Sequence, residues 1–259
     1  MKIISLGWGV QSFTMAAMVA LGELEPVDYA IHADTTHESV LTYSFAKRWT
    51  GWLEDREVNI VTVKPERANP LDNGYGVHDV PFYSIDHHNG KRGQGKRQCT
   101  LEWKIIPMRR WIAAELKRRG LKKTPGIVQQ WIGISLDEYR RMKDNDVKYI
   151  DNRWPLIEMK MTRASCIEWL TSHNLEVPPR SACTFCPFHS SKEWRQIKNT
   201  PEDWKEAVEV DLAIRKVRPS YDIFVHPARK PLDEIDFRTA EEKGQLSLWD
   251  QECEGICGI

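Results

Sequence analysis

In the N-terminal part of the chain, hydrophobic and polar positions follow two alternating periods. Short apolar runs at residues 2–6, 28–33 and 58–63 are typical of buried strands, whereas apolar residues recur at helical spacing over 10–21 and 41–56. Strands that alternate with helices in this way predict βαβ units, whose crossovers are right-handed. We therefore expect an α/β fold with a Rossmann-like parallel sheet flanked by helices.

The pattern changes at residues 69–95, where glycine and proline are frequent and a long loop is expected. Further along, the sequence predicts a helix over 100–119, a strand over 128–134, an extended segment over 147–153, a helix from the N-cap Thr162 to Ser172, and helices over 193–198 and 202–215. We expect two domains, an α/β domain over 1–160 and a smaller, mostly helical region with a polar tail over 161–259.

Composition narrows the classes of function. The 37 Lys and Arg residues balance 37 Asp and Glu residues, so the whole molecule has no charge that attracts nucleic acid or an anionic membrane. A site for a polyanion must therefore be a local patch. No apolar run approaches the roughly 20 residues that span a bilayer. Because the first strand begins directly after Met1-Lys2, we expect no signal peptide and a cytoplasmic location.

The connection from the first strand to the first helix has the features of a phosphate-binding loop. It runs from Ser5 to Ser12, and its glycines, Gly7 and Gly9, let the backbone approach an anion closely. The following helix offers free N–H groups at its N-terminus, and Ser12 adds a hydroxyl donor. Taken alone, a glycine-containing turn is equally typical of tight packing between a strand and a helix.

Asp34 and Thr35 follow the second strand, at the sheet edge where ligands of parallel α/β proteins bind. A carboxylate at this position suits Mg²⁺ or a ribose hydroxyl. The alternative is a helix N-cap, a position that Asp and Thr frequently occupy.

The chain has six cysteines, at positions 99, 166, 183, 186, 253 and 257. The spacing Cys183-x-x-Cys186 places two sulfur atoms within reach of one metal centre, and it is also typical of a redox pair. Cys166 lies in an amphipathic stretch and is expected in the core. Buried cysteines without a metal remain the alternative for the others.

Residues 91–97 form a cationic segment in a neutral protein. Arg92, Lys96 and Arg97 are candidates for contacts to substrate phosphates, and Lys104 follows shortly after them. A solvated charged loop is the alternative interpretation.

Five segments in this order resemble the PAPS reductase-like branch of the adenine nucleotide α-hydrolase (PP-loop ATP pyrophosphatase) superfamily. They are the loop over 5–12, Ala33-Asp34-Thr35-Thr36, the basic motif Arg97-Gln98-Cys99-Thr100 with Lys104-Ile105-Ile106-Pro107, the stretch from Gly133 through Glu138 to Arg141, and Cys183-Thr184-Phe185-Cys186-Pro187. The resemblance implies a fold of the PP-loop type, with a nucleotide-binding domain over 1–160 and a cysteine-containing helical region over 161–259.

The resemblance also implies which residues contact an adenine nucleotide. They are Ser5, Gly7, Gly9, Gln11, Ser12, Asp34, Thr35, Gly133, Glu138 and Arg141. The loop departs from the family's usual Ser-Gly-Gly-x-Asp-Ser at three positions, Gly7, Trp8 and Gln11. Because Gln11 replaces the family's acidic residue, the resemblance does not by itself imply that pyrophosphate is released as in standard members. Asp34 becomes the candidate ligand for Mg²⁺.

By the same resemblance, Cys99, Cys183 and Cys186 are expected to meet in space. Three thiolates fit a 4Fe-4S cluster with one open iron, or a zinc ion completed by His189 or a tail cysteine. The segment around Cys253 is similar to the catalytic C-terminal segment of sulfonucleotide reductases. Cys253 or Cys257 is therefore expected to attack sulfur, to complete the cluster, or to lie in a docked tail without chemistry.

Three functions follow as expectations. The first is sulfur transfer in which ATP activates DNA or tRNA and is split to AMP and pyrophosphate, as in DNA phosphorothioation or tRNA thiolation. Lys104 and Mg²⁺ would stabilise the negative charge that develops in this reaction. A cysteine desulfurase is the expected partner. The second is reduction of adenylyl sulfate or PAPS by Cys253 or Cys257, with thioredoxin releasing sulfite. The third is a nucleotide-binding module without catalysis. The sequence leaves the oligomeric state open, a homodimer included.

Overall fold

The structure is a computed structural model, and it describes residues 1–71, 79–215, 217–239 and 242. The chain forms two compact units, one of residues 1–68 and 99–183 and one of residues 69–98 and 184–259. This division differs from the boundary near residue 160 expected from the sequence. None of the helices described is long and apolar enough to cross a membrane.

The first unit is built on a parallel sheet of five strands in the order β3-β2-β1-β6-β7. The strands are β1 (Lys2–Ser5), β2 (Tyr29–Ala33), β3 (Ile60–Val63), β6 (Val128–Trp131) and β7 (Ile150–Arg153). Every pair of neighbours runs parallel, which confirms the predicted α/β fold. Strand order reverses between β1 and β6, so the loops after these two strands border the crevice where such folds bind ligands.

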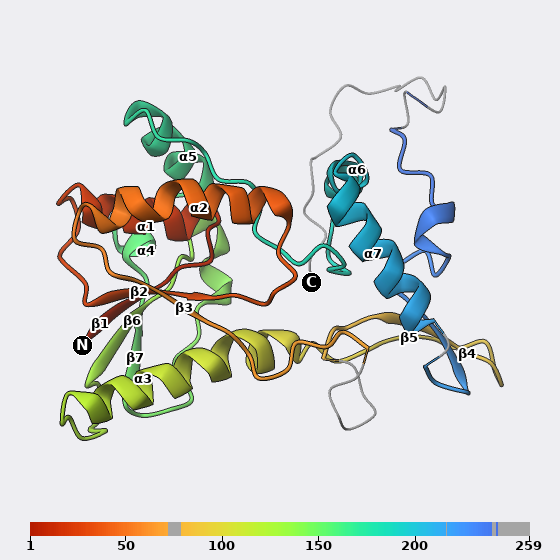
Figure 1. Cartoon of the computed structure of the whole chain (residues 1–259), viewed down its shortest axis with the longest axis horizontal. Helices are drawn as coiled ribbons and strands as arrows, with labels where there is room; N and C mark the ends of the chain where they lie inside the picture. The colour runs from red at the N-terminus through yellow and green to blue at the C-terminus, as the bar shows by residue number, and fades with distance from the viewer. Residues whose placement is uncertain (72–78, 216, 240–241, 243–259) are drawn as a thin grey trace. The chain divides into compact units, whose positions relative to one another are not determined.

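Helices cover both faces of this sheet (Figure 1). On one face lie α1 (Val10–Ala20), α2 (Val40–Glu54), the short α4 (Pro155–Glu158) and α5 (Arg163–Ser172), and on the other lies α3 (Ile106–Arg118). Strand β1 shows how the sequence produces two layers, because successive side chains point to opposite faces. Ile4 packs with Phe13 and Phe45, whereas Ile3 packs with Ile112 and Leu116, and all six are fully buried.

Local residues determine where two of the helices, α5 and α3, begin. The Thr162 side chain accepts a hydrogen bond from the backbone N–H of Ser165, and the backbone N–H of Thr162 donates to the Ser165 hydroxyl. This reciprocal cap confirms the predicted start of α5. The helix predicted over 100–119 is interrupted, because residues Thr100–Ile105 form a π-helix (η1) before α3 begins. Pro107 lies at the start of α3 and lacks the N–H that would continue an α-helical hydrogen-bond ladder from η1, while Ile106 before it stays in the α region.

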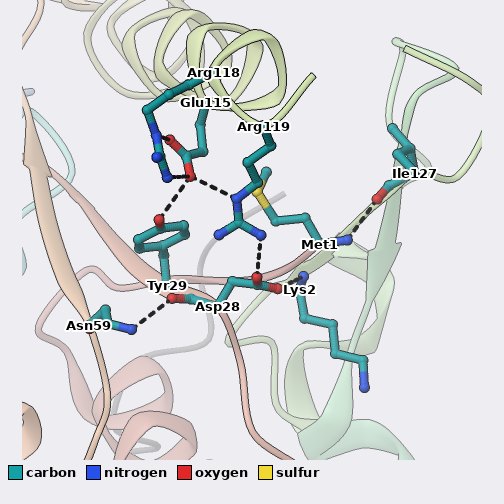
Figure 2. Close-up of polar contacts among 9 residues, drawn as sticks. All are labelled: Met1, Lys2, Asp28, Tyr29, Asn59, Glu115, Arg118, Arg119 and Ile127. Carbon is teal, nitrogen blue, oxygen red and sulfur yellow. Dashed lines mark hydrogen bonds and ion pairs between the residues drawn. The ribbon is translucent and has the colours of Figure 1, made fainter. Parts of the chain in front are cut away.

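The C-terminal end of α3 is tied to the start of β2 by a network of polar contacts (Figure 2). Glu115 accepts hydrogen bonds from the Tyr29 hydroxyl at 2.8 Å and from the guanidinium groups of Arg118 and Arg119. Arg119 also bonds Asp28. Hydrogen bonds from Arg118 outweigh the opposing effect of burial and, with those from Arg119 and Tyr29, lower the pKa of Glu115 to about 2.

The second unit contains a sheet in the order β5-β4-β8, made of β4 (Tyr83–Asp86), β5 (Arg92–Gln94) and β8 (Tyr221–Phe224). The expectation of a long loop over 69–95 is therefore wrong, because this segment holds two strands. The strands β4 and β5 are too short to show the alternating pattern of a strand in the sequence. Antiparallel pairing stabilises them: β4 pairs with β5 on one side and on the other with β8, a partner far along the chain that the sequence pattern did not indicate.

Among its described residues, the second unit also contains the helices α6 (Ser191–Lys198) and α7 (Pro201–Ile214) and a short 3-10 helix, η3 (Leu232–Glu234). Asp211 on α7 is fully buried. Its carboxylate accepts hydrogen bonds from the backbone of Val225 at 2.9 Å and of Leu232 at 3.0 Å, and it pairs with Arg215. A buried carboxylate is stable only when donors of this kind surround it. Through these bonds Asp211 joins α7 to the chain after β8 and to the start of η3.

Candidate functional site

The loop between β1 and α1 is held by a hydrogen-bonded turn of its own. The Ser12 hydroxyl accepts from the backbone N–H of Gly7 at 3.1 Å and donates to the carbonyl of Gly9 at 3.2 Å. Gly9 is the N-cap of α1, and no side chain caps this helix. The backbone donors of the first turn are thus left for a ligand, whereas the Ser12 hydroxyl serves the loop itself.

Trp8 occupies the position of the first glycine in the PP-loop motif that the sequence resembles, and its backbone has a conformation that glycine favours. Its φ is 57°, in the left-handed region, which is rare for a bulky residue. The indole is 2% exposed and packs near the rings of Phe13, His32 and Phe45. Burial of an aromatic side chain of this size offsets the backbone strain.

Gln11 and Glu138, both predicted nucleotide contacts, are brought together. The Gln11 amide donates to the Glu138 carboxylate at 3.2 Å, and Arg141 pairs with Glu138 at 2.6 Å. Glu138 and Arg141 lie on the 3-10 helix η2 (Leu136–Arg141). A carboxylate at position 11 would face that of Glu138, whereas the Gln11 amide donates a hydrogen bond to it.

The remaining contacts of the loop come from β6 and the segment after it. Gln130 donates to the Ser5 hydroxyl at 2.8 Å. Gly133 passes so close to the backbone of Gln11 and Ser12 that a side chain would not fit. These contacts place two more predicted residues, Ser5 and Gly133, at the loop.

Asp34 orders the turn after β2. One carboxylate oxygen accepts from the Thr36 N–H at 2.8 Å and the Tyr43 hydroxyl at 2.7 Å, and the other lies 3.3 Å from the Lys64 ammonium. Burial raises the pKa of Asp34, but these donors outweigh it and hold the pKa below its ordinary value. Burial and the Asp34 carboxylate raise the pKa of Tyr43. Both carboxylate oxygens are thus engaged, and a role of Asp34 with nucleotide or Mg²⁺ stays a prediction.

A second group of side chains surrounds a buried carboxylate that the sequence did not single out. Glu38 has a fully buried side chain, and it accepts from the Lys104 ammonium and the Ser181 hydroxyl, each at 3.0 Å. Glu38 also forms a backbone bridge with Cys183, whose sulfur lies 3.2 Å from the Thr35 hydroxyl. No local pattern marks Glu38, because its partners lie far along the chain.

Lys104 is the cation of this group. Burial disfavours its charged form, but the nearby Glu38 carboxylate outweighs that effect, and with the thiols of Cys183 and Cys99 it raises the pKa of Lys104. Two of the three predicted metal-binding cysteines therefore lie close to one ammonium group in the first unit. Cys166 is fully buried, which confirms its place in the core, and burial raises the pKa of its thiol to about 11.

The predicted metal centre is not assembled from the described residues. Within residues 1–71, 79–215, 217–239 and 242, no group of three or more His, Cys, Asp or Glu side chains is arranged to hold a metal ion. Cys186 belongs to the second unit, whereas Cys99 and Cys183 belong to the first. The described side chains do not form a ready site for a 4Fe-4S cluster or zinc, and a metal at these cysteines stays a prediction.

The predicted phosphate contacts lie in the second unit. Arg92, Lys96 and Arg97 are all exposed. The Arg97 guanidinium lies over the ring of Phe188, 5.4 Å from its centroid. The tail residues Cys253 and Cys257 lie outside the described residues.

Comparisons with known proteins find a likeness among solved structures. No family model and no curated protein matches the sequence. Among solved structures, the phosphoadenylyl-sulfate (PAPS) reductase from Candida auris, in a phosphate complex, matches with a TM-score of 0.44 and 12% identity, over 68% of this chain and 74% of that one. The chain is similar to a PAPS reductase. A similarity at this level concerns the path of the chain and carries over neither substrate nor activity.

Proposed function

We propose that this protein binds an adenine nucleotide at the loop from Ser5 to Ser12 and carries out sulfur transfer, activating a nucleic-acid substrate with ATP. One observation carries the proposal: a thiol-bearing segment lies beside the loop within one unit. A Cβ atom on Gly9 would lie 3.9 Å from Ser181, and Cys183 contacts Thr35 at the end of the neighbouring strand. Lys104 lies near the same thiol.

The chemistry divides into two displacements. An oxygen of the nucleic acid attacks the α-phosphorus of ATP, and pyrophosphate leaves. The terminal sulfur of a persulfide, supplied by a cysteine desulfurase, then replaces the adenylated oxygen, AMP leaves, and an external thiol reduces the disulfide that remains. Free N–H groups at the start of α1 bind phosphate oxygens, and Lys104 stabilises the developing negative charge. A 4Fe-4S cluster or zinc at the three cysteines, and Mg²⁺ at Asp34, stay predictions.

One observation favours a second candidate. Gln11 stands where the family has an acid and is engaged by Glu138, so the loop lacks a carboxylate that supports cleavage of ATP. Reduction of adenylyl sulfate or PAPS requires no such cleavage. In that reaction a tail cysteine, Cys253 or Cys257, attacks the sulfur, and thioredoxin releases sulfite.

Mass spectrometry of nucleotides distinguishes these functions. The protein, purified without oxygen, is mixed with ATP, with ATP and DNA or RNA, or with PAPS. AMP and pyrophosphate that form only with nucleic acid support the proposal, whereas sulfite from PAPS supports the second candidate. Nucleotide that binds and stays intact in every mixture identifies a non-catalytic module.

A pair of lysine variants tests the site. Lys104→Met should abolish turnover of whichever nucleotide is used, while Lys47→Met, an exposed lysine on α2, should leave it unchanged. Circular dichroism at the assay temperature verifies that both variants are folded. Equal activity of folded Lys104→Met and the unaltered protein contradicts the assigned role of Lys104.

A further inference from the structure

We propose that the second unit carries a binding surface for single-stranded nucleic acid, which we call the hairpin surface. It consists of Lys91, Arg92, Lys96, Arg97 and Phe188. The inference rests on the function proposed above, since that function requires a nucleic-acid substrate, and it specifies both the strandedness of the substrate and the residues that hold it.

Charge is the first observation. Four cations fall within the seven residues 91–97 with no acid among them, and all four side chains are exposed. In the part of the chain that the structure describes, none of the four forms an ion pair with a carboxylate. The surface is therefore a local cationic patch on a protein of zero formal net charge, which is the arrangement that phosphate groups of a polyanion require.

The backbone beneath the cations is well anchored. Arg229 donates to the carbonyls of Ser84 at 3.2 Å and Gly93 at 3.1 Å, and so joins β4 to β5. The pairing continues past β5, where the N–H of Gly95 donates to the carbonyl of Phe82 at 2.9 Å. Cations on an ordered hairpin lose less entropy on binding than cations on a free loop.

Phe188 supplies a feature that phosphate binding alone does not need. Its side chain is 43% exposed, and the guanidinium of Arg97 lies over its ring. Exposed aromatic rings and arginine planes are the platforms on which unpaired bases stack, and cations beside them follow the backbone phosphates. Bases within a duplex are already stacked and paired, so this combination favours a single strand.

Fluorescence anisotropy of labelled oligonucleotides, measured with the full chain, tests the surface. Short mixed-sequence single strands of DNA and RNA and the matching duplex are titrated between about 50 and 200 mM salt. Single strands should bind more tightly than the duplex. Combined Arg92→Ala and Lys96→Ala should lower the slope of log K against log salt by about 1.4, from two lost contacts at about 0.7 each.

Phe188→Ala should weaken binding of single strands roughly tenfold and leave the salt slope unchanged, because it removes stacking and no charge. The matched control is Lys117→Ala with Lys122→Ala, which removes two exposed positive charges from the first unit. It should leave binding unchanged. Equal losses from the control and the hairpin variant, tighter binding of the duplex, or no binding of any oligonucleotide overturns the inference.

The two proposals fail separately. A protein that binds single strands through this surface but leaves ATP and PAPS intact retains the inference and loses the proposed function. AMP and pyrophosphate that form only with nucleic acid, together with oligonucleotide affinities that the hairpin-surface variants leave unchanged, retain the proposed function and lose the inference.

Discussion

Gly133 lies against the first turn of α1, where a Cβ atom on Gly133 would come within 2.9 Å of the backbone nitrogen of Ser12. The neighbouring atoms are backbone, which cannot rotate away as a flexible side chain does. This close approach connects the loop after β6 to the loop after β1, the two loops that border the crevice of the sheet.

Gly133→Ala should therefore displace the first turn of α1. We expect a loss of about 1–3 kcal/mol in the free energy of unfolding, as for other overpacked positions. Nucleotide affinity should fall at least about tenfold, because a 1 Å displacement in a binding site has effects of this order or larger. Chemical denaturation and a nucleotide titration measure the two effects.

Gly51→Ala is the matched control for this change. Gly51 lies within α2, and nothing would contact a Cβ atom there within 4 Å. Alanine should raise stability by about 0.5–1 kcal/mol through its helix propensity, with nucleotide affinity unchanged. If the two variants behave alike, the approach of Gly133 to Ser12 is looser than described.

Lys104→Met leaves the buried carboxylate of Glu38 without its cation. We expect a loss of about 2 kcal/mol, below the range for a fully buried pair, because the Lys104 side chain is 37% exposed. Glu38→Gln added to the same chain should recover part of this loss, since an amide is less costly to bury than an unpaired charge. Urea unfolding of the unaltered protein, both single variants and the double variant measures the coupling.

This pair also predicts a dependence on alkaline pH. The folded-state pKa of Lys104 lies above its ordinary value of 10.5, so the stabilisation is complete below pH 10.5 and is lost as the pH rises through the raised pKa. Thermal unfolding across this range should show the loss in the unaltered protein. Lys104→Met should lack that component, and an identical alkaline decline in both proteins would contradict the assignment.

Glu115→Gln tests the network that joins α3 to β2. The carboxylate accepts from Tyr29, Arg118 and Arg119, and its replacement should cost about 2 kcal/mol at neutral pH. Because the pKa of Glu115 is lowered from 4.5 to about 2, its stabilisation is present above pH 4.5 and is lost as the pH falls toward 2. The variant should therefore lose less stability over that interval than the unaltered protein.

Acid unfolding followed by circular dichroism measures this difference. The exposed Glu54 near the end of α2 provides the control, and Glu54→Gln should follow the unaltered protein at every pH. Parallel curves for the unaltered protein and Glu115→Gln would show that the network does not depend on the charge.

Cys166 should resist alkylation in the folded protein. Its thiol is fully buried, and a pKa of about 11 leaves little thiolate near neutral pH. Iodoacetamide treatment followed by peptide mass spectrometry should find Cys166 modified only after unfolding in denaturant. Modification at equal rates in the folded and unfolded protein contradicts its assignment to the core.

Strands β1, β2 and β3 and helices α1 and α2 could be predicted because each buries an apolar face with a single period. Along β1, the side chains of Ile3 and Ile4 point to opposite faces of the sheet, and each packs against a different layer of helices. The order of residues in the sequence is enough to predict this. The strands of the second unit could not be predicted in the same way. The pairing of Tyr83 with Phe224 joins segments far apart in the chain, and neither strand is long enough to show a period.

The candidate site was predicted only in part, for a similar reason. Gly7, Gln11, Gly133 and Glu138 belong to motifs, and the structure brings them together at one loop. Glu38 belongs to no motif, because its function depends on Lys104, which reaches it only through the packing of η1 beside β2. Contacts of this kind arise from tertiary structure and leave no local signal.

Trp8 has a consequence for how a ligand would arrive at the loop. Its indole is part of the hydrophobic core, so the path of the backbone from Gly7 to Gly9 is set when the protein folds and does not wait for a bound anion. Binding to such a loop involves little loss of backbone entropy. The rate of association is then governed by diffusion and electrostatic attraction, and not by the time that a flexible loop would need to close.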